Sequence, residues 1–279
     1  MRRMIARTLL GSLLVVAGWP SCAVGQDAMA PPRDIFRLGV RAGVQLFSYE
    51  EREAAVRSEY DTAGLALGLT GMLRLGDRFR ITGDYLGAFL AESSETWRDV
   101  DTPFGVGTQH NDLSLDFHVL DLDLGYSVLK RDGFEWAIVA GWHAYWLGFE
   151  RGNFTITTAT VIIGAPGLSV TEDVAGQGVK LGTVLEARVA PRVWVEAGFA
   201  GYYVYDVDVE NSALGSLESE GHALRWRLAL DYFLNPRVTL GAGYEGHFIH
   251  VDRATSAIAI LPENKTWAHT LTVRLGVWF

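Results

Sequence analysis

WAHTLTVRLGVWF, the sequence of residues 267–279, alternates between two kinds of side chain. The first set is almost entirely apolar: Trp267, His269, Leu271, Val273, Leu275, Val277 and Phe279. The second set is mostly small or polar and includes Arg274. A period of two places the sets on opposite faces of a β-strand. The stretch is also longer than the roughly 3–10 residues of strands in soluble proteins, which indicates a strand with one face in lipid.

The same alternation returns along the chain and predicts ten antiparallel strands, joined as five hairpins. The expected strands are 35–48, 60–75, 79–92, 112–129, 134–149, 177–190, 192–208, 222–234, 237–251 and 267–279. A hydrophobic fraction of 49% together with 31 glycines fits a curved sheet that faces lipid on one side. We therefore expect an all-β fold, a transmembrane antiparallel up-and-down β-barrel closed by its last strand.

The predicted connections alternate in length. Short turns rich in Gly, Pro, Asn and Asp are expected at Gly76–Arg78, Lys130–Gly133, Pro191 and Asn235–Pro236. Longer polar loops are expected at 49–59, 93–111, 150–176, 209–221 and 252–266. Because outer-membrane barrels have short periplasmic turns, both chain ends are expected in the periplasm. The 150–176 loop could extend the wall, fold inward as a constriction, or supply the extra hairpin of a twelve-stranded alternative.

The N-terminus has the pattern of a secretory signal peptide. Three arginines precede an apolar run from Thr8 to Trp19, and small residues follow up to Gly25. The apolar run is shorter than the about 20 residues of a transmembrane helix. In an outer membrane of the Gram-negative type, we expect three parts: a signal peptide at 1–25, a short periplasmic segment at 26–34 and the barrel at 35–279.

Composition excludes several kinds of partner and site. The net charge of −9 becomes −12 once Arg2, Arg3 and Arg7 leave with the signal peptide, so nucleic acid is not expected as a partner. Cys22 is the one cysteine and lies in the signal peptide, which excludes thiol catalysis and cysteine-bound zinc in the mature chain. We expect no cofactor and no metal. The expected partners are outer-membrane lipid, lipopolysaccharide, the outer-membrane assembly machinery and small solutes.

The inward face carries a balanced set of charges. Nine basic residues are expected there: Arg37, Arg41, Arg74, Arg80, Lys180, Arg188, Arg225, Arg227 and Arg274. Nine acidic residues oppose them: Asp84, Asp116, Asp121, Asp123, Glu135, Glu186, Glu196, Asp231 and Glu245. The histidines expected on this face are His118, His143 and His247.

Two functions fit such an interior. Charges removed from bulk water require partners, so the residues can form an ion-pair network that fills a structural barrel. Alternatively they line a narrow water-filled channel that selects small solutes. Ten strands lie just above the size at which side chains fill a barrel and well below the about 16–18 of open porins. The strand number favours the filled barrel and leaves the channel open.

A change of phase in the 112–129 strand suggests a third function. Apolar residues are odd-numbered from Leu113 to Val119 and even-numbered from Leu122 to Val128, which predicts a β-bulge near Val119–Leu120. On this assignment Asp116 and His118 face the lumen as an acid–base pair. The alternative function is therefore an outer-membrane hydrolase, either a lipid A-modifying enzyme or a protease similar to the omptins, which have ten strands and an Asp/His site near the loops.

Two further resemblances rest on sequence patterns. Leu271, Val273, Leu275 and Val277 with the terminal Phe279 resemble the signal by which the outer-membrane assembly machinery recognises its substrates. The segments Tyr60–Gly68, Leu73–Gly76 and Val119–Tyr126 are similar to the Legionella-type major outer membrane proteins. That family is described as pore-forming, so the second resemblance implies a barrel that conducts.

Overall fold

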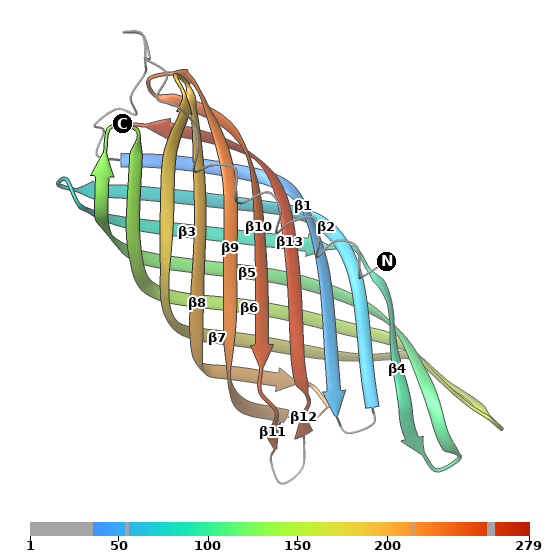
Figure 1. Ribbon diagram of the computed structural model, residues 1–279. Helices are drawn as coiled ribbons and strands as arrows, with labels where there is room; N and C mark the ends of the chain where they lie inside the picture. The colour runs from blue at the N-terminus through green and yellow to red at the C-terminus, as the bar shows by residue number, and fades with distance from the viewer. Residues whose placement is uncertain (1–35, 54–55, 214, 256–259) are drawn as a thin grey trace.

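The computed structural model describes residues 36–53, 56–213, 215–255 and 260–279, nearly all of them in one antiparallel sheet that closes into a barrel (Figure 1). The expected signal peptide at 1–25 and the segment at 26–34 lie outside the described residues. Among the described residues, no helix has the length and apolar character needed to cross a membrane.

Ten strands form the ring, and neighbours in the ring pair antiparallel. They are β1 (Phe36–Glu53), β2 (Val56–Leu75), β3 (Phe79–Leu90), β5 (Gly105–Arg131), β6 (Phe134–Thr158), β7 (Ile162–Ala190), β8 (Val193–Asn211), β9 (Gly215–Asn235), β10 (Val238–Val251) and β13 (Glu263–Trp278). The extra strands are β4 (Ser93–Thr102), which pairs with β5 and β2, and the two-residue strands β11 (Ala254–Thr255) and β12 (Ile260–Leu261). The predicted ten-stranded barrel is confirmed, and the twelve-stranded alternative is wrong.

The barrel closes where the first strand meets the last. β1 pairs with β13 from Arg37 opposite Trp278 to Arg52 opposite Glu263. At the turn side the Phe279 amide donates to the Phe36 carbonyl at 2.9 Å. Closure pairs the backbone groups of both sheet edges, which a bilayer without hydrogen-bonding water requires.

The connections on the loop side are much shorter than the sequence predicts. β1 continues to Glu53 and β2 begins at Val56, so most of the expected 49–59 loop is strand. β6 and β7 likewise replace most of the 150–176 loop. Figure 1 shows β5, β6 and β7, together with the added strand β4, extending past the other strands. Beyond the lipid the outer face no longer needs apolar side chains. The alternation therefore ends while backbone pairing continues.

The two faces of the wall differ as the strand alternation requires. On β13, Leu271 and Val273 are each 62% exposed on the outside, whereas Ala268 and Thr270 point inward and are fully buried. Similar exposed Leu and Val side chains cover the outer face of β1, β2 and β9. An apolar surface of this extent is stable only against lipid.

Deleting Phe279 tests the predicted assembly signal. The Phe279 ring is 62% exposed and contacts the Phe36 ring at a centroid distance of 6.0 Å, so its burial contributes at most about 1.5–3 kcal/mol. We expect the deleted chain to refold in detergent with nearly the parent's strand content but to reach the outer membrane poorly in cells. Equal surface levels of the two chains would contradict a signal role.

Candidate functional site

The inward side chains follow the same order on several strands of the ring. From the turn side to the loop side they pass from charged to apolar and then to polar: Arg41, Phe47 and Glu51 on β1, Asp121, Phe117 and Asn111 on β5, and His143, Leu147 and Arg151 on β6. The interior therefore has three levels. We refer to them as the charged network, the apolar layer and the upper cluster.

Arg225 of β9 lies at the centre of the charged network and is 3% exposed. Its Nη2 contacts Asp84 Oδ1 at 2.7 Å and Glu245 Oε2 at 2.8 Å, and its Nη1 contacts Asp121 Oδ2. Arg41 of β1 binds the same Asp84 and Glu245, at 2.6 and 2.8 Å. Two guanidinium groups thus share two carboxylates, so each of these buried charges has at least two opposite neighbours.

Asp121 links this group to the wall formed by β6, β7 and β8. Its carboxylate contacts His143 Nδ1 at 2.7 Å and Lys180 Nζ at 3.1 Å, and it accepts a hydrogen bond from Tyr202 Oη at 3.3 Å. Lys180 also binds Asp123 at 2.8 Å. A fully buried carboxylate with this many donors is held by the fold itself, which leaves few of its lone pairs free for a substrate.

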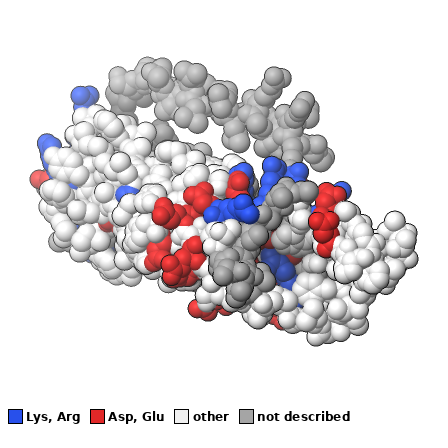
Figure 2. Space-filling model, turned by 90° about the horizontal axis from the view of Figure 1, so that it is seen from below, with Lys and Arg blue, Asp and Glu red and all other residues white. Residues whose placement is uncertain are grey.

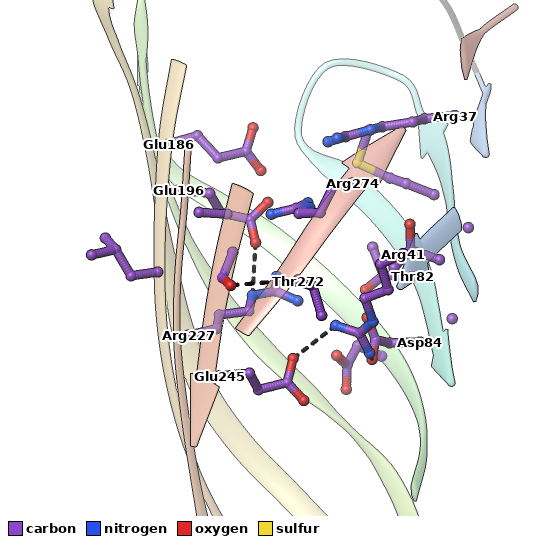
Figure 3. Close-up of a pocket in the computed structure, with 18 of the residues that line it drawn as sticks. Arg37, Arg41, Thr82, Asp84, Glu186, Glu196, Arg227, Glu245, Thr272 and Arg274 are labelled. Carbon is purple, nitrogen blue, oxygen red and sulfur yellow. Dashed lines mark hydrogen bonds and ion pairs between the residues drawn. The ribbon is translucent and has the colours of Figure 1, made fainter. Parts of the chain in front are cut away.

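The turn side of the network consists of further ion pairs. Arg227 binds Glu196 at 2.8 Å and Arg80 binds Glu186 at 2.5 Å. Figure 3 shows Arg227 and Arg41 projecting toward one another from opposite sides of a cavity. The cavity has about 60 Å³, room for a few water molecules.

The structure pairs eight of the predicted inward bases with eight of the predicted acids. They are Arg37, Arg41, Arg74, Arg80, Lys180, Arg225, Arg227 and Arg274 with Asp84, Asp121, Asp123, Glu135, Glu186, Glu196, Asp231 and Glu245. Arg188, the ninth base, instead reaches the turn and binds Asp132 at 3.1 Å. His143 and His247 point inward and contact Asp121 and Glu245.

Glycines opposite the arginines make this packing possible. Gly68 pairs with Arg41 across β1 and β2, and a Cβ there would lie 2.4 Å from Arg41 Nε. Gly125 pairs with Arg80, and its Cβ would lie 2.8 Å from Arg80 Cγ. A guanidinium stem can therefore lie flat against the neighbouring strand only where that strand has no side chain.

The apolar layer corrects the predicted face of β5. Leu113, Leu115, Phe117 and Val119 are buried inside the barrel instead of facing lipid. β5 pairs without a register shift from Asp116 to Ser127, so the predicted bulge near Val119–Leu120 is wrong. Odd-numbered residues of β5 face inward throughout this stretch. They are apolar within the apolar layer and acidic within the charged network. Other members of the layer are Phe47, Leu86, Tyr145, Leu147, Val204, Val207, Ile249 and Val251.

Asp116 and His118 consequently lie on the outer face of the barrel, and their predicted inward position is wrong. Asp116 is exposed. His118 Nδ1 lies 2.9 Å from Tyr85 Oη, and the two rings are nearly parallel. The wall of the barrel therefore separates His118 from His143 and His247, and the three do not form one site.

The residues of the upper cluster lie in segments that the sequence predicts to be loops, so the alternation does not reveal the cluster. Arg151 Nε binds Glu95 at 2.9 Å, while its two other nitrogens lie 3.5 Å from Glu172 and 3.6 Å from Glu51. Tyr49 Oη donates to Glu51. The signal was present in β1, because Glu51 has the same parity as the inward residues Arg37 and Arg41.

The acids of this cluster, which lies beyond the lipid, differ in their electrostatics. Burial raises the pKa of Glu51 to about 8. Arg151, 3.6 Å away, and the hydrogen bond from Tyr49 oppose this shift, while the charges of Glu172 and Glu95 add to it. Burial also disfavours the charge on Glu95, yet its pKa is lowered by Arg151 and by hydrogen bonds from Asn111 and Ser58. The better-bonded Glu95 is thus the ionised partner of Arg151, and Glu51 is protonated at neutral pH.

No protein-family model matches the sequence, and no curated protein matches it. Among solved structures, the fold is similar to the outer membrane protease OmpT from Escherichia coli, with a TM-score of 0.70, 10% identity, and coverage of 88% of this chain and 97% of that one. OprG from Pseudomonas aeruginosa also aligns, with a TM-score of 0.37, 10% identity and coverage of 88% and 98%. The first comparison shows a shared outer-membrane β-barrel fold. With the apolar outer wall, it places the chain in an outer membrane of the Gram-negative type.

Removing Arg225 tests the centre of the network. Arg225→Leu leaves Asp84, Asp121 and Glu245 short of a partner, so we expect a loss of about 3–5 kcal/mol in unfolding free energy in detergent. Arg274→Leu is the matched control. Its nearest carboxylate, Asp231, is 3.8 Å away and keeps Arg37 at 2.9 Å, so the loss should be smaller. Equal losses would refute the central role of Arg225.

The upper cluster predicts a pH dependence of stability. The fold raises the pKa of Glu51 from 4.5 to about 8, so it favours the protonated side chain. The contribution of Glu51 to the free energy of unfolding is therefore full below about pH 4.5 and declines as the pH rises to 8. We expect the melting temperature to fall between pH 5.5 and 8.5, and Glu51→Gln to flatten this change. Glu59→Gln, on the outward face of β2, serves as the control and should keep the parent's slope. An unchanged slope in Glu51→Gln would contradict the assignment.

Proposed function

We propose that this protein is a sealed, non-enzymatic outer-membrane barrel whose interior serves its stability and whose outward surfaces serve its function. The observation that carries the proposal is the apolar layer, which lies between the charged network and the upper cluster. A solute crossing the barrel would have to pass both polar levels and this layer. Of the two functions that the sequence predicts, we therefore favour a filled structural barrel over a narrow channel.

The layer opposes ions for two reasons. Phe117 and Tyr145, which lie on neighbouring strands, are fully buried. The Phe47 and Phe117 rings lie 5.8 Å apart across the interior. An ion that leaves water for such surroundings loses several kcal/mol of hydration, and few polar groups are there to replace it. The charged network adds a second obstacle, since its guanidinium and carboxylate groups already bind one another.

The cavities of the barrel fit the same interpretation. A space of about 790 Å³ opens at the turn side, among residues such as Arg74, Phe134 and Trp194. Toward the loop side the next space is the 60 Å³ cavity within the charged network, and the apolar layer follows it. Pore formation, which the resemblance to Legionella-type proteins implies, is thus not part of our proposal.

A hydrolytic role receives no support from the candidate residues. Asp116 and His118 lie outside the lumen, and His118 is bonded to Tyr85. The described acid–histidine pairs inside the barrel, His143 with Asp121 and His247 with Glu245, are enclosed by other charges. The similarity to OmpT at 10% identity concerns the fold, so protease activity stays a property of that protein.

Planar-bilayer recording of the refolded chain tests the proposal. We expect no conductance steps from the parent, because the apolar layer excludes ions. Phe47→Ala/Phe117→Ala removes two rings of the layer and should give a measurable ion leak through the residual cavity. Phe89→Ala/Phe199→Ala, which truncates two rings on the lipid face, is the matched control and should stay silent.

Stepwise conductance by the parent would overturn the sealed barrel. Circular dichroism of each variant before recording verifies that strand content is retained. Silence of the Phe47→Ala/Phe117→Ala variant with full strand content would show that the layer does not determine the seal.

A further inference from the structure

The hairpin of β6 and β7 extends beyond the rest of the wall on the loop side, and there one edge of β7 has no neighbouring strand. Phe154–Thr157 pair with Ile162–Ala165, so the segment extends the wall outward and does not fold into the lumen. On the other side of β7, pairing with β8 begins only at Glu172 opposite Asn211. Within the described structure, Ile162–Val170 therefore has a strand on its β6 side alone.

This edge lacks the charges by which sheets usually protect themselves. No charged residue occurs from Phe154 to Thr171, and Ile162 and Leu168 are 72% and 52% exposed. Figure 2, a view from below Figure 1, shows the end of this hairpin at the right as a lobe without charged side chains on the visible face. Natural sheets generally block exposed edges with lysines, prolines or bulges, because free N–H and C=O groups recruit other strands.

The hairpin has a partial block that limits the length of pairing. Pro166 has no N–H, and Gly167 has a φ of 82°, opposite a register shift between Gly152 and Phe154. The block divides the edge into two short runs, Ile162–Ala165 and Leu168–Val170. An incoming strand can pair with either run, whereas long unbroken stacking of chains is hindered.

The base of this edge is acidic. Four exposed carboxylates gather where β7, β8 and β9 meet below the free edge: Asp173, Asp208, Glu210 and Glu218. No Lys or Arg occurs in residues 152–179 or 193–224, so these charges are not neutralised from their own strands. They favour a partner that brings positive charge.

We propose that the β7 edge, Ile162–Val170, binds an extended polypeptide strand that carries apolar side chains at alternate positions and Lys or Arg at one end. Within each of the two runs, Ile162–Ala165 and Leu168–Val170, main-chain groups of a strand match the free N–H and C=O groups of the edge in spacing and direction. The basic end would lie against Asp173 and Glu210. A second copy of this chain would bring the same carboxylates together, which disfavours self-pairing.

This inference goes beyond the sealed barrel, since peptide binding and conductance are measured separately and either can fail alone. The probe is a fluorescein-labelled decapeptide of alternating valine and threonine that ends in two lysines, titrated against the full chain in lipid nanodiscs and followed by anisotropy. We expect saturable binding that weakens with added salt. N-methylation of alternate peptide nitrogens, which removes main-chain donors, should weaken binding by about tenfold or more.

Paired variants separate the edge from a general apolar patch. Ile162→Lys/Leu168→Lys places charge on the edge at exposed positions and should abolish binding. Phe104→Lys, on the neighbouring hairpin of β4 and β5 and 54% exposed in the parent, is the control and should leave binding nearly unchanged.

Several results would overturn the proposal. They are absence of binding by the lysine-ended peptide, equal binding of its N-methylated form, and equal loss in Phe104→Lys. A concentration-dependent dimer of the parent in analytical ultracentrifugation, lost in Ile162→Lys/Leu168→Lys and unaffected by the peptide, would assign the edge to a second copy instead.

Discussion

A closed ring of ten strands leaves little space for bulk water in the middle of the barrel, so every charge that points inward there must find its partner. This constraint determines the interior. Arg225 and Arg41 share Asp84 and Glu245, and Asp121 extends the group to the opposite wall. The glycines of the wall follow from the same need, because a paired guanidinium lies flat only over a strand without a side chain. The outer surface is under a different constraint, set by lipid, and the alternation of each strand satisfies both.

Much of the architecture could be predicted because alternation specifies the two faces of a strand. Residues 267–279 predict an outward row and an inward Arg274, and the structure has both. In β5 the alternation predicts the wrong face. An apolar side chain in the apolar layer cannot be distinguished by sequence from one that faces lipid. The alternation therefore predicts the wrong face for Phe117 and a bulge that β5 does not have. Only the register against β3 and β6, which is a long-range property, distinguishes the two environments.

The contacts within the site were less predictable than its faces. Parity indicates that Arg225 and Arg274 point inward, but not that one contacts three carboxylates while the other lies 3.8 Å from its nearest. These differences depend on the stagger of strands around the ring. The upper cluster was missed for a related reason: outside the lipid, polar residues on both faces of a strand resemble a loop. Glu51 and Arg151 belong to walls that continue after the membrane signal has ended.

The pairing of β1 with β13 also constrains how the chain reaches this structure. Gln45 and Thr270, which share a hydrogen bond across the seam, are 225 residues apart in the sequence. One edge of β1 therefore stays unpaired until β13 has been synthesised. The loop-closure entropy must be lost before the hydrogen bonds of this seam can offset it. Partial barrels would leave unpaired edges and unpaired lumen charges at the same time. Folding and membrane entry should accordingly be a single cooperative event, with the newly made chain protected from aggregation until its C-terminus is available.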